Sequence, residues 1–172
     1  HLLHQVLKDV LGEHINQKGS FVRAEHLRFD FTNFKQISQN ELQIIERKMN
    51  AKIRENLPVS TEIMSVETAK KSGAIALFGE KYDNKVRVVS IGDYSKELCG
   101  GIHLKFTGEI GFLKILSESS IAAGIRRIEA ITGEFSENYF QNLADKIINI
   151  EQTLNVKSDS VEKKIQSLIS EN

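Results

Sequence analysis

Hydrophobic residues recur at the spacings of helices and strands along the first two thirds of the chain. Apolar positions 2, 3, 6, 7, 10 and 11 share one helical face, which predicts a helix over residues 1–11 that ends at Gly12. Strict alternation in Leu27-Arg28-Phe29-Asp30-Phe31 predicts a half-buried strand. We expect this strand to form a hairpin with residues 20–22, entered through residues 17–20.

A second helix is predicted by its start and stop signals. Ser38 and Glu41 have the spacing of a capping box, and apolar residues follow at helical spacing from Leu42 onward. Because the residue before a proline disfavours helical geometry, Pro58 implies that this helix ends by Asn56.

The rest of the pattern mixes strands with short helices and then becomes helical. Strands are expected over residues 59–66, 85–91, 111–119 and 125–131, and a short helix over residues 67–72. They show no regular βαβ alternation, so the pattern favours an α+β fold, with an antiparallel β-sheet packed with helices. Beyond Gly133, apolar residues recur three and four apart. We therefore expect a domain over residues 1–133 and a helical C-terminal extension or connector over residues 134–172.

Composition narrows the classes of partner. The chain has 23 basic residues (Lys and Arg) and 23 acidic residues (Asp and Glu), so its net charge does not indicate a nucleic-acid or membrane partner. Such a contact would need a local patch of basic residues. No apolar run is long enough to span a bilayer. We expect a soluble, cytoplasmic protein and, because the chain begins at a histidine, a part of something longer.

The chemistry of the chain centres on Cys99-Gly100-Gly101-Ile102-His103, which holds its single cysteine. A thiolate and an imidazole four positions apart, with two glycines between them, can turn onto one metal ion. His1 or His4 could supply a third ligand of a catalytic zinc site. Two alternatives stay open: a nucleophilic Cys99 with His103 as its base, and a small buried cysteine beside a surface histidine.

Seven stretches, in the same order along the chain, resemble the editing domain of alanyl-tRNA synthetase. The last of them is followed by a tail that resembles the beginning of that enzyme's next helical region. The stretches are His1-Leu2-Leu3-His4, Gln17-Lys18-Gly19-Ser20, Leu27-Arg28-Phe29-Asp30-Phe31, Asn56-Leu57-Pro58, Ala76-Leu77-Phe78-Gly79-Glu80-Lys81-Tyr82, Cys99-Gly100-Gly101-Ile102-His103 and Gly124-Ile125-Arg126-Arg127-Ile128-Glu129.

The resemblance implies a zinc-dependent hydrolase that removes wrongly attached serine or glycine from alanine tRNA. In that family the ion lies between a His-x-x-x-His pair and the Cys-x-x-x-His pair. His1 matches the second histidine of the first pair, which implies His1, Cys99 and His103 as Zn²⁺ ligands and a further histidine upstream of this chain. His4 follows the pair and takes no ligand role. The implied partners are the acceptor end of alanine tRNA and the remainder of the synthetase chain.

Other residues of these stretches take implied roles at the substrate. Gln17 matches a polar residue of the editing pocket, where an amide can hold a water or a ribose hydroxyl, although its spacing also fits a turn. Arg126 and Arg127 could contact the terminal phosphate or ribose, or be plain strand-face arginines. Ile102 stands where the family more often has threonine, a difference in the pocket wall.

Two rival interpretations remain. Within the enzyme class, the chain could be a free-standing or threonyl-type editing domain, although the helical tail and residues 28–31 and 76–80 favour the alanyl type. In another class, it could be a non-catalytic tRNA-binding or assembly module with a structural metal.

Overall fold

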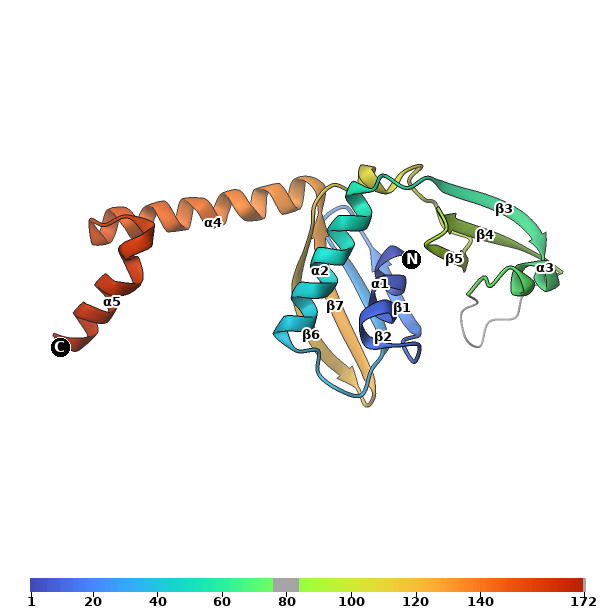
Figure 1. Cartoon of the computed structure of the whole chain (residues 1–172), viewed down its shortest axis with the longest axis horizontal. Helices are drawn as coiled ribbons and strands as arrows, with labels where there is room; N and C mark the ends of the chain where they lie inside the picture. The colour runs from blue at the N-terminus through green and yellow to red at the C-terminus, as the bar shows by residue number, and fades with distance from the viewer. Residues whose placement is uncertain (76–83, 172) are drawn as a thin grey trace. The chain divides into compact units, whose positions relative to one another are not determined.

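Four antiparallel strands form the larger sheet of the computed structural model, which describes residues 1–75 and 84–171 (Figure 1). Phe29 lies opposite Ile128, and Leu27 lies opposite Ala130, so these apolar residues share one face. In order across the sheet, the strands are β1 (Gln17–Val22), β2 (Leu27–Thr32), β7 (Ile125–Thr132) and β6 (Leu113–Ala122).

Two helices cover the apolar face of this sheet (Figure 1). They are α1 (Leu2–Leu11) and α2 (Gln39–Arg54), and both confirm the helices predicted from hydrophobic spacing. Ser38 and Glu41 form the predicted capping box of α2. Fully buried side chains such as Leu7, Ile45 and Phe31 join the helices to the sheet in one core.

A second, smaller sheet lies in the same unit of the chain. Its antiparallel strands are β3 (Val59–Ser65), β4 (Lys85–Ile91) and β5 (Ser95–Leu98), and the short helix α3 (Val66–Lys71) packs against β3 and β4. The α+β class is confirmed, with two sheets where the sequence suggested one. Strand β5 was missed because its buried positions include the polar Ser95 and Glu97, which reverse the usual alternation.

Polar side chains of α2 fasten the edge strand β6. Asn50 is buried, and its side-chain amide donates to the carbonyl oxygen of Leu113 at 2.8 Å while accepting from the Leu113 N–H at 2.8 Å. Glu46 accepts from the Ile115 N–H at 2.8 Å and pairs with Lys114 at 2.9 Å. Backbone groups that an edge strand would otherwise leave open are thereby satisfied by one helix.

The chain divides into two compact units, His1–Gly133 and Glu134–Asn172. The second consists of most of α4 (Gly133–Leu154), the 3₁₀ turn η2 (Ser158–Ser160) and α5 (Val161–Ser170), which confirms the helical character predicted there. None of the helices in the described ranges combines the length and apolar content that a membrane span requires. The resembling stretch at residues 76–82 lies outside the described residues.

We expect Asn50→Leu to lower the free energy of unfolding by about 2–4 kcal/mol, because it leaves the Leu113 N–H and carbonyl buried without partners. Asn40→Leu, an exposed change on the same helix, should alter it by no more than about 0.5 kcal/mol. Urea denaturation followed by circular dichroism measures both. Equal stability of the two variants would refute a structural role for the Asn50 contacts.

Candidate metal centre

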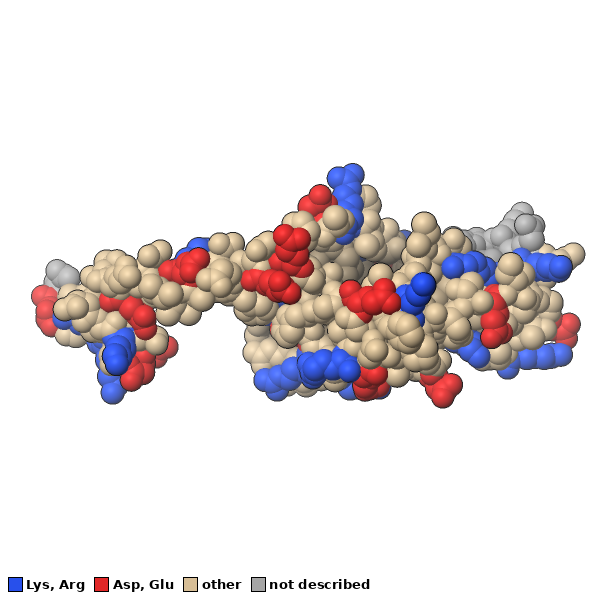
Figure 2. Space-filling model, turned by 90° about the horizontal axis from the view of Figure 1, so that it is seen from above, with Lys and Arg blue, Asp and Glu red and all other residues tan. Residues whose placement is uncertain are grey.

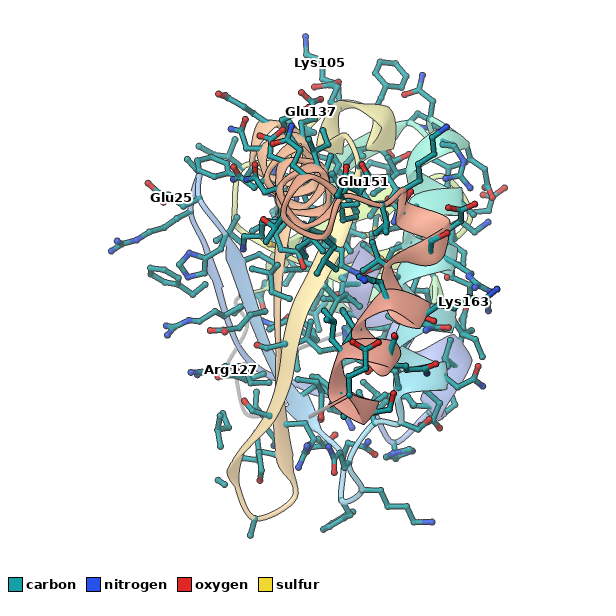
Figure 3. The ribbon with its side chains drawn as sticks, turned by 90° about the vertical axis from the view of Figure 1, so that its left-hand side faces the viewer. Glu25, Lys105, Arg127, Glu137, Glu151 and Lys163 are labelled. Atoms are coloured by element: carbon teal, nitrogen blue, oxygen red, sulfur yellow. The ribbon has the colours of Figure 1, made fainter. Side chains whose placement is uncertain are left out.

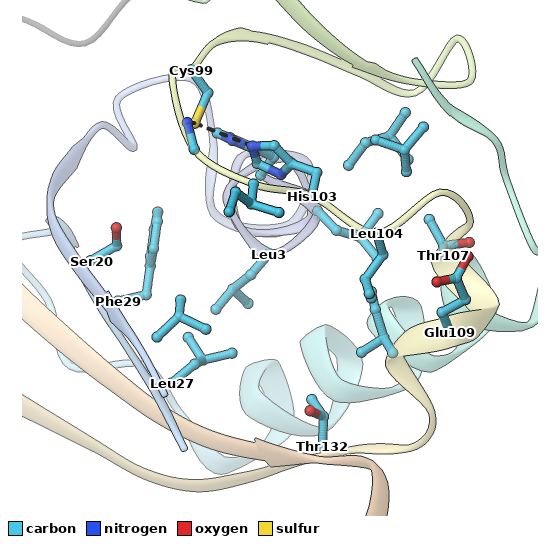
Figure 4. A pocket seen from close by; sticks show the side chains of 18 of the residues that line it. Leu3, Ser20, Leu27, Phe29, Cys99, His103, Leu104, Thr107, Glu109 and Thr132 are labelled. Carbon is cyan, nitrogen blue, oxygen red and sulfur yellow. Dashed lines mark hydrogen bonds between the residues drawn. The ribbon is translucent and has the colours of Figure 1, made fainter. Parts of the chain in front are cut away.

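Three side chains that are distant in sequence meet at one point beside α1. His1 immediately precedes α1, Cys99 immediately follows β5, and His103 lies four residues further on (Figure 4). One candidate ligand atom from each lies within 4.8 Å of the other two. Cys99 Sγ lies 3.3 Å from His103 Nε2, and the ring centroids of His1 and His103 are 4.9 Å apart. The fold thus assembles a thiol and two imidazoles, the donor set that suits zinc.

The loop that carries Cys99 and His103 is held by Arg87 of β4. The guanidinium Nη1 of Arg87 donates to the carbonyl oxygens of Cys99 at 2.8 Å and Gly101 at 2.6 Å. Within the loop, the Gly101 N–H donates to Cys99 Sγ at 3.3 Å. A Cβ atom at Gly101 would lie 3.4 Å from Cys99 Sγ and 3.6 Å from His103 Nε2. Glycine there keeps the space between the two candidate ligand atoms clear.

His4 has a different environment from His1, although the two lie one turn apart. Its side chain is buried, with Nδ1 3.1 Å from Oε1 of Glu97 and Nε2 3.4 Å from the carbonyl oxygen of Ile15. His4 is therefore not one of the three clustered side chains, which agrees with the resemblance and selects His1 from the two candidates that helical spacing allowed. Its buried position differs from that of a surface histidine.

Glu97 controls the electrostatics of the cluster. Its carboxylate accepts from His1 Nδ1 at 2.7 Å. Burial opposes a charge on His1, but interactions with Glu97 and then with Cys99 together outweigh burial and raise the pKa of His1 to about 9. Burial likewise opposes a charge on Glu97, but the bonds from His1 and His4 lower its pKa to about 2. Burial and the positive charges of His1 and Arg87 lower the pKa of His103.

A cavity of about 910 Å³ opens beside the three clustered side chains (Figure 4). Its wall is largely apolar and comes from both sheets and from α1, with members such as Leu3, Leu27, Phe29, Val86 and Leu104. The 3₁₀ turn η1 (Thr107–Ile110) adds polar atoms at Thr107 and Glu109. An apolar wall with a few polar groups is typical of a small-molecule site.

Charged residues on the cavity wall are mainly basic. Arg23 and Lys85 line the cavity together with Arg87, whereas Glu109 is the carboxylate among the described lining residues. Both signs of charge are spread over the molecular face in Figure 2, in keeping with the zero net charge. The local excess of cations at the cavity therefore favours an anionic ligand without a strongly basic surface.

The other predicted site residues have separate positions. Gln17 lines the cavity, with its amide nitrogen 3.4 Å from the hydroxyl of Ser20, which also lines it. Arg126 pairs with Glu118, with Nη2 2.7 Å from Oε2. Arg127 pairs with Asp30 and lies on the sheet face opposite α1 and α2 (Figure 3). Neither arginine is among the described residues that line the cavity, so their role at the substrate stays a prediction.

Sequence reasoning missed Glu97 and Arg87. A signal for Glu97 did exist, because alternate residues of a strand share a face and Ser95, Glu97 and Cys99 have that spacing. Arg87 offered none, since its contacts are to backbone carbonyls of a loop that folds back onto β4.

Comparison with known proteins shows that the sequence is similar to part of aminoacyl-tRNA synthetases. Residues 86–129 match the family described as the Threonyl and Alanyl tRNA synthetase second additional domain. The chain is 52% identical over 172 residues to an alanine–tRNA ligase of Clostridioides difficile, covering 100% of this chain and 20% of the relative. It is 49% identical over 168 residues to the alanine–tRNA ligase of Idiomarina loihiensis, covering 98% of this chain and 19% of the relative.

The predicted resemblance to alanyl-tRNA synthetase is therefore confirmed, and it extends along nearly the whole chain. The chain is related to one segment of these enzymes and spans about one fifth of the length of the relatives it matches.

We expect the free energy of unfolding, measured with a metal chelator present, to fall by up to about 3 kcal/mol between pH 6.5 and pH 9. The folded chain holds the His1 proton up to about pH 9, whereas an unfolded histidine releases it near 6.5. The stabilisation is therefore complete below pH 6.5 and is lost progressively as the pH rises to about 9. Urea titrations across this range measure the slope. His1→Gln should flatten the curve, and a flat curve for the unchanged chain would contradict the ion pair with Glu97.

Proposed function

We propose that this chain is a zinc-dependent editing domain of an alanyl-tRNA synthetase, which hydrolyses the ester of serine or glycine wrongly attached to alanine tRNA. Residues 1–133 would form the editing domain, and residues 134–172 would connect it to the remainder of the synthetase. The meeting of His1, Cys99 and His103 at the edge of a large cavity is the observation that carries the proposal.

The donor atoms fit a zinc ion. A thiolate and neutral imidazoles are ligands that zinc prefers, and His1, Cys99 and His103 would supply three of them. The upstream histidine that the resemblance implies would be a further ligand. When bound, zinc supplies a Lewis acid at the mouth of the cavity. The Arg87 bonds to the loop hold Cys99 and His103 for that role, while Cys99 acts as a ligand and not as the nucleophile.

The cavity suits the end of a charged tRNA. Its volume of about 910 Å³ can hold a nucleoside with an attached amino acid, and Arg23 and Lys85 on its wall favour a ligand that carries phosphates. The amide of Gln17 can both donate and accept, and so hold a water or a ribose hydroxyl in place. A neutral amide does not act as a base at pH 7, so Gln17 orients and does not remove a proton.

Selection against alanine has a simple physical basis in this proposal. Serine carries a hydroxyl that alanine lacks, and a pocket that bonds this hydroxyl leaves a buried polar group unpaired when alanine is present. Correctly charged alanine tRNA is thereby spared. The apolar part of the wall discriminates only weakly between the two.

We expect Cys99→Ala to lose zinc and to slow release of serine from alanine tRNA by on the order of 100-fold or more, because the ion loses its thiolate ligand. The assay compares serine-charged with alanine-charged alanine tRNA, using the chain extended upstream so that a histidine stands four positions before His1. Ser119→Ala, an exposed change on β6, should leave both zinc content and rate unchanged.

The outcomes separate the rival functions. Serine release that is selective and disappears with Cys99→Ala supports editing. Zinc-loaded, folded protein that binds tRNA but releases no amino acid would favour a tRNA-binding module with a structural metal. Release from threonine tRNA in preference to alanine tRNA would favour a threonyl-type domain.

We expect Gln17→Ala to slow serine release about tenfold at unchanged zinc content, since one lost hydrogen bond of about 1.4 kcal/mol corresponds to that factor. Gln43→Ala, an exposed change on α2, is the matched control and should keep the full rate. Single-turnover deacylation together with metal analysis separates the two effects. Equal rates for both variants would return Gln17 to the turn role that its sequence also allows.

A further inference from the structure

One buried carboxylate contacts both His4 of α1 and His1, which immediately precedes that helix. Glu97 is 2% exposed, and its two oxygens have different partners: Oε2 lies 2.7 Å from His1 Nδ1, and Oε1 lies 3.1 Å from His4 Nδ1. The Ser95 hydroxyl adds a third contact to Oε1 at 3.5 Å. A carboxylate taken out of water in this way needs donors on both oxygens, and the two imidazoles provide them.

The contact to Glu97 determines which nitrogen of His1 is available for a metal. An ionised carboxylate can only accept hydrogen bonds, so Nδ1 of His1 carries its hydrogen toward Glu97. Nε2, on the far side of the ring, is then the nitrogen left for a metal ligand. Cys99 and His103 contribute the other candidate atoms of the cluster.

We propose that Glu97 is a positioning residue of the metal centre, which sets the ring orientation and tautomer of His1, and that His4 holds Glu97 in place. This role rests on the metal site in the proposed function. It explains why a second histidine is buried beside the site without being one of the clustered ligands. A partner of this kind on a ligating histidine fixes the ring and strengthens its binding.

Contacts between α1 and neighbouring elements also help to keep His1 beside Glu97. The Tyr94 hydroxyl donates to Asp9 of α1 at 2.6 Å, and Lys48 of α2 lies 3.4 Å from the same carboxylate. Tyr94 lies in the turn between β4 and β5. Helix α1 is therefore attached to that hairpin at two points, through the Asp9–Tyr94 and His4–Glu97 contacts. Two such attachments restrain sliding of α1 along the hairpin and therefore hold His1 at a constant distance from Glu97.

The test is the zinc dissociation constant, measured by competition with a chromophoric chelator. It uses the chain extended upstream so that a histidine stands four positions before His1, and this extended chain without a substitution is called the unchanged chain. Glu97→Gln keeps the size of the side chain but can accept at only one of its two polar atoms, and we expect zinc affinity to fall about 10–100-fold. Glu46→Gln, which removes a carboxylate from the α2–β6 contact, is the matched control and should keep the affinity.

A second readout separates positioning from general destabilisation. In the zinc-loaded unchanged chain, ¹⁵N spectra of the imidazoles should show His1 with Nδ1 protonated and Nε2 bound to metal. Glu97→Gln should give a mixture of the two ring arrangements, whereas Glu46→Gln should leave the His1 signals unchanged even if it lowers the melting temperature. If Glu97→Gln does not fold, His4→Leu removes one donor to Glu97 at similar volume, and we expect a loss of affinity of several-fold.

The outcomes distinguish this proposal from the one it rests on. The metal site stands if the unchanged chain binds zinc and Cys99→Ala does not. In that case, a zinc affinity of Glu97→Gln within twofold of the unchanged chain refutes the positioning role. Where Glu97→Gln is unfolded, the same criterion is applied to His4→Leu. If the unchanged chain binds no zinc, or Cys99→Ala binds it equally well, both proposals fail.

Discussion

The buried Glu97 carboxylate joins parts of the molecule that come from different layers. It lies on β5 of the three-stranded sheet, whereas His4 lies in α1 and His1 immediately precedes α1, which packs on the four-stranded sheet. Removing a carboxylate from water is costly unless its oxygens have donors, and the two histidines supply one to each oxygen of Glu97. This requirement ties the position of α1 to the position of the Cys99 loop.

Around that connection, polar and apolar residues have separate tasks. Apolar side chains from both sheets shape the wall of the cavity, whereas polar wall residues such as Thr107 and Glu109 make specific contacts to backbone groups. Arg87 holds the loop through backbone carbonyls, so its contacts do not depend on the side chains of the loop. At the edge of the larger sheet, Asn50 and Glu46 likewise accept hydrogen bonds from backbone N–H groups of β6.

The comparisons with known proteins cover different parts of the candidate metal centre. The family match over residues 86–129 includes Cys99, His103, Glu97 and Arg87, all within or beside the β4–β5 hairpin. His1 lies outside that match and is covered only by the similarity to alanine–tRNA ligases that runs along the whole chain. The candidate metal centre therefore needs both α1 and the matched segment, and neither holds all three clustered side chains.

Local patterns in the sequence were sufficient for α1, the β1–β2 hairpin, the capped helix α2 and the helical C-terminal part, because periodicity and capping depend on neighbouring residues. Spacing also drew attention to Cys99 and His103. It could not select His1 over His4, because one helical turn offers both to the same side. That choice depends on where Cys99 and His103 lie, because they are more than 90 positions away along the chain and cluster with His1 only when the sheets pack. Strand β5 escaped notice for the same reason: its buried polar residues are favourable only beside partners that folding brings to them.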